Sequence, residues 1–335
     1  MASVLTSLNV NAQTSLDPPL ESKAITERIP LDPDIDLWQT ATPLQVPLAW
    51  QNTTKPMLLG PSISDLTLRS MNNGTWIGFL IEWKDPTRDS TVLHTEDFRD
   101  SVAIAMPVLD EPQPPFLGMG ESDKPVNILH WRSDWQQDID SRLQELEDAN
   151  PNLWVSYYPF ADTASLESIP PVANFSQAFV TGWAANNPLS NPFKETPVED
   201  LVAEGFGTLT TQKSQDVIGR GTWDEEGWNV VIARPLATSD PSDAQLQPGG
   251  LKKISFAVWE GSANEVDGKK SFSNWHTLSV AGRGAIDGES AAQMVEGADG
   301  VFLFWREIVI GVVFLFSIAV LIIAVSPKFY RRAKA

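Results

Sequence analysis

Cysteine is absent from this chain of 335 residues, and histidine occurs only three times, as His94, His130 and His276. Without thiols the chain can form no disulfide, no thiolate-bound metal or iron–sulfur site, and no thioether link to a haem. Three histidines also disfavour a metal centre built from several imidazoles. The composition therefore excludes cysteine-based chemistry and disfavours a multi-histidine metal site.

Basic side chains are scarce, since 24 Lys and Arg stand against 43 Asp and Glu and give a formal net charge of -19. A chain with no evident basic surface is a poor partner for nucleic acid, whose phosphates need neutralising. The sequence also contains no Gly-x-Ser-x-Gly elbow, P-loop or dinucleotide fingerprint. Glu260, Glu265 and Asp267 lie close enough in sequence to suggest glycosidase carboxylates, but acidic loop residues are common in so acidic a chain.

Tryptophan, proline and glycine are abundant, with 13, 25 and 21 residues, which is typical of a β-rich domain with many turns. An Asn-Gly pair between apolar runs predicts a hairpin over 65–83, and a second hairpin is predicted over 219–235. Near-helical spacing of apolar residues predicts a helix over 134–150. The predicted fold class is mainly β, an antiparallel β-sandwich with short helical insertions.

The predicted sandwich occupies residues 27–280. An insertion is expected at about 150–200, where no periodicity is clear. Residues 1–26 are polar and predict a flexible N-terminal arm.

An apolar run near the C-terminus, residues 301–327, predicts one transmembrane helix, long enough for the roughly 30 Å hydrocarbon core. A small, polar stretch, 281–300, reads as a linker to it. The tail, 328–335, is basic, so the positive-inside rule places it in the cytoplasm. We therefore expect a single-pass protein of the cell membrane whose large N-terminal domain lies on the extracytoplasmic side.

Residues 256–275, FAVWEGSANEVDGKKSFSNW, join an alternating strand, a glycine-containing loop and a lysine pair, Lys269 and Lys270. One interpretation is a β-hairpin with a basic, solvated tip. The other is a metal ligand, because a lysine amine can bind a metal if burial lowers its pKa.

Met119 lies between Gly118 and Gly120 after a proline-rich loop. A thioether there could fill the core, or it could act as a soft ligand for haem iron. His130, in a predicted strand, is interpreted as a core histidine rather than a ligand.

Three segments, 114–135, 204–236 and 256–275, together resemble the haem-b-binding domain of the ethylbenzene dehydrogenase gamma subunit and its relatives in molybdenum enzymes. The resemblance covers residues 27–280. It implies a β-sandwich that holds one non-covalent haem b, with one Met and one Lys as axial iron ligands. Carried onto this sequence, the ligands are Met119 and Lys270.

The nearest rivals of these two ligands are Met106 and Lys269. Four aromatic residues are candidates for packing near the porphyrin: Trp131, Phe206, Trp259 and Trp275.

The resemblance implies an electron-transfer subunit rather than a catalytic one. Its partners would be the iron–sulfur beta and molybdenum alpha subunits of an oxidoreductase such as a nitrate reductase, a nitrite oxidoreductase or a dimethylsulfide dehydrogenase, or another redox carrier. Two alternatives remain open. They are a stand-alone respiratory cytochrome b on the outer face of the membrane, and a haem-free, carbohydrate-binding-like module whose surface tryptophans stack on sugars.

Overall fold

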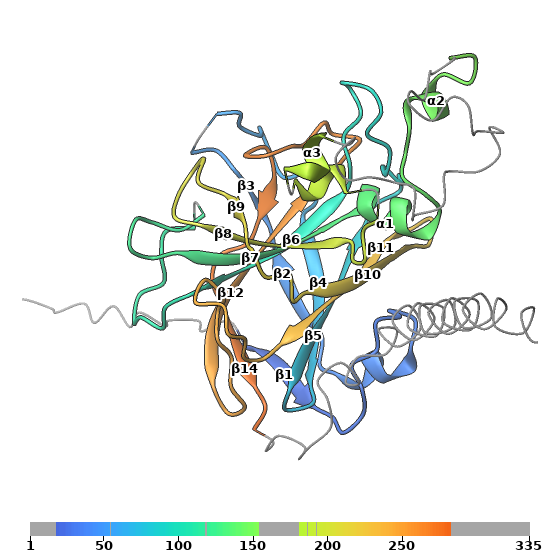
Figure 1. Ribbon diagram of the computed structural model, residues 1–335. Coiled ribbons are helices and arrows are strands. Elements are labelled where there is room, and N and C mark those ends of the chain that lie inside the picture. Colours follow the sequence, from blue (N-terminus) through green and yellow to red (C-terminus); the bar gives the residue numbers. More distant parts are fainter. Residues whose placement is uncertain are drawn as a thin grey trace, which may run out of the picture.

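The computed structural model describes residues 18–53, 55–117, 119–153, 181–185, 187–191 and 193–282. Within them the chain is mainly β, with few and short helices, as predicted (Figure 1). The strands form one large sheet of 14 strands. Their bounds are β1 Leu20–Ala24, β2 Leu44–Pro47, β3 Ala49–Trp50, β4 Asp65–Asn72, β5 Trp76–Lys84, β6 Ser101–Pro107, β7 Val126–Arg132, β8 Val198–Ala203, β9 Thr210–Thr211, β10 Ile218–Trp223, β11 Gly227–Pro235, β12 Leu251–Trp259, β13 Ser271–Phe272 and β14 His276–Val280.

Both predicted hairpins are present. β4 pairs with β5, and β10 pairs with β11, each antiparallel. At the first turn the side chain of Asn73 accepts hydrogen bonds from the backbone N–H groups of Thr75 and Trp76, while Gly74 adopts a φ of 87°. A positive φ favours glycine, which explains why the Asn-Gly pair marks this turn.

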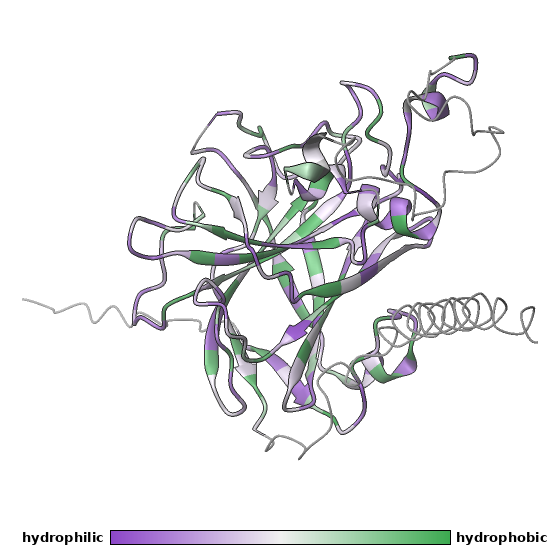
Figure 2. Ribbon diagram, in the orientation of Figure 1, coloured by the Kyte–Doolittle hydropathy of each residue, from purple (hydrophilic) through white to green (hydrophobic). Residues whose placement is uncertain are grey.

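The sheet curls so that its two halves face one another across a common core. β4, β5 and β11 supply one wall, and β6, β7 and β12 supply the other. Three tryptophans meet in this core, where the ring of Trp131 on β7 lies 4.9 Å from that of Trp228 on β11 and 6.3 Å from that of Trp83 on β5. Hydrophobic residues follow the strands, whereas the connecting loops are largely hydrophilic (Figure 2). Burial of this apolar surface is the main force that holds the halves together.

The N-terminal segment differs from the prediction. The polar pattern over 1–26 predicts a flexible arm, but β1 lies within it and pairs parallel with both β14 and β4. Leu20 is fully buried, and the side chain of Asn72 donates to the Ser22 carbonyl oxygen at 3.1 Å. β1 therefore lies between β4 and β14 and joins them into one sheet. Because both of these pairings are parallel, the sheet is not antiparallel throughout.

The predicted helix over 134–150 is divided. Helix α1 spans Ser133–Asp140, and a single turn, α2, spans Leu146–Ala149. Another turn, α3, spans Thr181–Ala184. β8 begins at Val198, so the end of the predicted insertion belongs to the sheet.

None of the helices in the described part of the chain is long and apolar enough to cross a membrane. The predicted linker over 281–300 lies almost wholly outside the described residues, and the predicted transmembrane helix over 301–327 and the basic tail over 328–335 lie entirely outside them.

One buried carboxylate makes stability depend on pH. Asp200 on β8 accepts hydrogen bonds from Asn127 at 2.6 Å and Gln212 at 3.1 Å. Burial, and then repulsion from Asp243, raises the pKa of Asp200 to about 7. In the unfolded chain an aspartate titrates near pH ~4. Between these values the folded state binds more protons than the unfolded state, so stability falls as pH rises.

We therefore predict that this group lowers the free energy of unfolding by at most about 1.4 kcal/mol per pH unit between about pH 4 and about pH 7. Asp200→Asn keeps the accepting oxygen and removes the charge, so it should flatten the slope. Urea denaturation at several pH values measures how the free energy of unfolding changes with pH. Asp34→Asn, at an exposed aspartate, is the control. An unchanged slope in Asp200→Asn would contradict the prediction.

Candidate functional site

Strands β6 and β12 are buried on both faces, and their outward faces carry small side chains. On β6, Val102 and Ile104 enter the core, whereas Ala103 and Ala105 face outward. On β12, Ala257 and Trp259 share that outward face. Because side chains alternate along a strand, one face builds the core while the other remains available for a second task.

The outward face forms a second apolar cluster, which we call the platform: Ala103, Ala105, Met119, Val126, Ile128, Leu201, Ala203, Ala257, Trp259 and Trp275. Four of its members stay half-buried, namely Ala105, Ala257, Met119 and Trp275. These four are the side chains that a bound molecule could touch. The alanines on β6 and β12, Ala103, Ala105 and Ala257, would leave space for a flat group against the sheet.

Met119 reaches the platform on a constrained loop. Its own φ is 74° and that of Gly120 is 86°. A Cβ on Gly120 would lie 2.8 Å from the carbonyl oxygen of Ala203, so the loop packs directly on the end of β8. The indole N–H of Trp275 donates to the Pro115 carbonyl oxygen at 2.8 Å and holds the loop from its other side.

The two neighbouring lysines have different surroundings. The amine of Lys269 donates to the carbonyl oxygens of Ala263 and Asn264, at 3.0 and 2.8 Å, and so ties its own loop together. The amine of Lys270 lies 4.9 Å from the centroid of the Trp259 ring. Among the described residues it has neither a hydrogen-bond acceptor nor an acidic ion-pair partner.

Burial lowers the pKa of Lys270 to about 8, against the opposing effect of the Asp267 charge. A neutral amine has a free lone pair and can bind a metal ion. Lys270 therefore meets the requirement for a ligand better than Lys269, whose amine is already engaged.

His130 projects from β7 toward the same region. Its ring stacks on that of Trp259, with centroids 4.8 Å apart. Its Nε2 atom is buried and makes no hydrogen bond within the described part of the chain. Burial, followed by the charges of Arg132, Arg99 and Lys270, holds the pKa of His130 well below 6.5, so the imidazole is neutral. An unpartnered buried polar atom is costly, and a group bound at this place would satisfy it.

Three other sequence candidates lie elsewhere. Trp131 and Met106 are fully buried in the core between the two halves of the sheet, on the inward faces of β7 and β6. Phe206 is exposed in the loop after β8 and does not belong to the platform. The structure thus gathers Met119, Trp259, Trp275 and Lys270, and leaves out Trp131, Phe206 and Met106.

These residues fit the predicted haem. The platform offers one thioether and alanines that leave room for a flat ring, and its Trp259 contacts both the Lys270 amine, whose pKa is lowered, and the ring of His130. A soft sulfur and a neutral nitrogen are suitable ligands for haem iron. The sequence patterns do not single out Ala103, Ala105 and Ala257; their alternation with core residues is the only signal that could have found them.

The family model that matches this chain is described as ethylbenzene dehydrogenase, and the match covers residues 35–271. That range contains every platform residue except Trp275. It also contains Lys270.

Two proteins are similar to this chain over most of its length. One, from Haloferax mediterranei, is named as a candidate respiratory nitrate reductase heme subunit; it is 23% identical over 267 residues, which cover 80% of this chain and 74% of that protein. The other is the chlorate reductase subunit gamma of Ideonella dechloratans, 23% identical over 241 residues, covering 71% of this chain and 74% of that protein.

Among solved structures, a carbohydrate binding module of family 9 from Caldicellulosiruptor kristjanssonii in complex with glucose aligns with a TM-score of 0.37 and 13% identity. The alignment covers 81% of this chain and 98% of that one. A likeness this distant carries no functional argument.

We predict that Trp275→Phe loosens the Met119 loop, because it removes the hydrogen bond to Pro115 while keeping an aromatic ring. The expected loss of stability is about 1 kcal/mol, as for a typical buried hydrogen bond. Faster hydrogen exchange is expected at the Lys124 amide, which donates to Glu121 at the end of this loop. Trp50→Phe, at an exposed tryptophan, is the control; equal exchange in the two variants would argue against the anchoring role.

Proposed function

This chain belongs to the ethylbenzene dehydrogenase family, and we propose that it is a mono-haem b electron-transfer subunit of a molybdenum oxidoreductase complex. The names of its relatives, a nitrate reductase heme subunit and a chlorate reductase gamma subunit, support this role. The substrate would be acted on by a catalytic partner, not by this chain.

One observation carries the proposal. The thioether of Met119 belongs to the platform, and the amine of Lys270 lies against the ring of Trp259, which is also a member of it. A lysine at a solvated hairpin tip would keep its ammonium in water. Here the amine is instead held against an indole, with a lowered pKa and no acidic partner among the residues described.

Bound haem would supply one-electron chemistry, because its iron changes between the ferric and ferrous states. The chain's own residues would bind and insulate it. Met119 and Lys270 would be the iron ligands, with Lys270 in its neutral form. The indole of Trp259 is fixed by its N–H donating to the Asp267 carbonyl oxygen at 3.0 Å, and its ring lies 4.9 Å from the Lys270 amine. His130 could donate one hydrogen bond from Nε2 to the bound group.

The partners follow from the proposed role. Iron–sulfur and molybdenum subunits would exchange single electrons with this chain, which would pass each electron to or from a further carrier. The apolar segment over 301–327 would anchor the complex to the cell membrane, with the β domain on the extracytoplasmic side.

We predict a b-type pyridine haemochrome spectrum for the purified protein, because a chain without cysteine cannot hold a thioether-linked haem. A folded protein that neither contains haem nor takes up added haemin would refute the proposed function. A spectrum of the c type would contradict the predicted mode of attachment.

We also predict that Met119→Ala and Lys270→Ala each abolish the low-spin spectrum, because each would remove one of the two proposed iron ligands. Lys269→Ala is the matched control. Its amine only binds loop carbonyl groups, so the low-spin spectrum should persist. Circular dichroism checks that each variant is folded. An unchanged spectrum in both ligand variants would show that other residues hold the iron.

The carbohydrate-binding alternative finds little support in the tryptophans. Among those whose burial is described, only Trp50 is exposed, at 38%. Sugar stacking requires accessible aromatic faces. The absorption spectrum separates these two functions, and co-purification with molybdenum and iron–sulfur subunits separates a complex subunit from a stand-alone cytochrome.

A further inference from the structure

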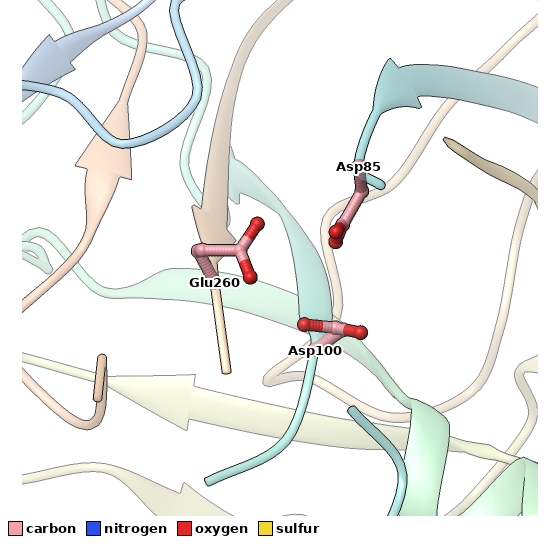
Figure 3. Close-up of side chains that lie close together, drawn as sticks. All are labelled: Asp85, Asp100 and Glu260. Carbon is pink, nitrogen blue, oxygen red and sulfur yellow. The ribbon is translucent and has the colours of Figure 1, made fainter. Parts of the chain in front are cut away.

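Three buried carboxylates converge at one end of the sheet, outside the platform. Asp85 follows β5, Asp100 precedes β6, and Glu260 follows β12. All three side chains point toward one another (Figure 3). One carboxylate oxygen from each lies within 4.8 Å of the other two.

The charge of this cluster has no counterpart in the described part of the chain. Asp85 is 0% exposed, and its Oδ2 atom is buried without a hydrogen-bond partner among the residues that the structure describes. None of the ion pairs formed by described Lys, Arg or His residues includes any of the three carboxylates. A buried carboxylate left unpaired costs several kcal/mol, so the cluster requires a neutralising species.

The other oxygens of the cluster are fixed in place by backbone donors of the surrounding loops and by the indole of Trp228 on β11. Asp100 accepts from the backbone N–H of Gly261 at 2.9 Å and from the indole N–H of Trp228 at 2.9 Å. The Oδ1 atom of Asp85 accepts from the backbone N–H of Thr87 at 3.0 Å. Such hydrogen bonds orient the carboxylates and leave Asp85 Oδ2 directed at its neighbours, as in a preorganised metal site.

We propose that Asp85, Asp100 and Glu260 bind a calcium ion. Calcium takes oxygen ligands at about 2.3–2.6 Å, so its ligand atoms can lie up to about 5 Å apart. The three oxygen atoms all lie within 4.8 Å of one another, which is compatible with that sphere. Magnesium binds oxygen at about 2.0–2.1 Å, which limits its ligands to about 4.2 Å apart, and it prefers to keep several waters.

A proton is the alternative neutralising species. Burial, and then the charge of Glu260, raises the pKa of Asp85 to about 7. Burial, and then the charge of Asp85, raises the pKa of Asp100 to about 8. If a shared proton were the only occupant, removing one carboxyl charge would stabilise the protein whether or not calcium is present.

The position of the site gives calcium a structural consequence. Glu260 begins the loop that ends at Lys270, and its backbone N–H donates to Glu265 in the same loop at 2.9 Å. A cation that joins Glu260 to Asp85 and Asp100 would hold this loop to the end of β5 and to the start of β6. The calcium site itself does not depend on haem, so its test leaves the proposed function untouched.

The experiment titrates calcium into the full-length protein after treatment with EDTA, with and without haem. Calorimetry is expected to show one saturable site, and calcium is expected to raise the melting temperature. Terbium provides a local probe, because the Trp228 indole contacts Asp100 and can sensitise a bound lanthanide. Its luminescence should be displaced by calcium and far less effectively by magnesium.

Asp85→Asn and Glu260→Gln should each abolish the calcium-induced shift and the terbium signal. Asp34→Asn removes the same charge at an exposed position, so this variant should keep both the calcium-induced shift in melting temperature and the terbium signal. Circular dichroism checks that each variant is folded. If one of the two does not fold, the other still tests the proposal. Absence of calcium binding to the wild-type protein would overturn the proposal, as would wild-type calcium affinity in both variants. Higher stability of both variants without any calcium effect would show that the cluster holds a proton instead.

Discussion

The structure depends on strands that are buried on both faces. β6, β7 and β12 direct one set of side chains into the core between the two halves of the sheet. The alternate residues of the same strands form an outward platform of small and aromatic residues. Because the pleat fixes alternation, the core and the platform share one rigid backbone. Groups held on the platform therefore gain their precision from the packing of the core behind it.

Indole groups connect this rigid sheet to the loops that cover it. Trp275 holds the Met119 loop through Pro115, and Trp259 holds the 260–270 loop through Asp267. Each indole places its ring on the platform and its N–H on a loop carbonyl group. A tryptophan suits this task because it combines a large apolar surface with one directional donor. The same residues thus shape the site and fix the loops that supply its ligands.

The loop from Glu260 to Lys270 has buried ionisable groups at both ends, and they raise the same physical problem. A buried amine without an acid and a buried carboxylate cluster without a base are both unfavourable in a low-dielectric interior. The amine shifts its pKa downward and the carboxylates shift theirs upward. In each case a bound metal would remove the cost, the haem iron at Lys270 and calcium at Glu260. The loop would then be held by metal ions at its two ends.

The sequence by itself determined the mainly β class, the two hairpins, the absence of thiol chemistry and the motifs that include Met119 and Lys270. These features are local, since alternation, turn residues and composition can be read along a few residues. Only the tertiary structure decided that Trp131 faces the core, that the Lys269 amine binds carbonyl groups while the Lys270 amine lies against the Trp259 ring, and that Asp85, Asp100 and Glu260 meet. It also decided that β1 joins the sheet. These outcomes depend on which strands pair across long stretches of chain, and such pairing is set by packing that no local pattern records.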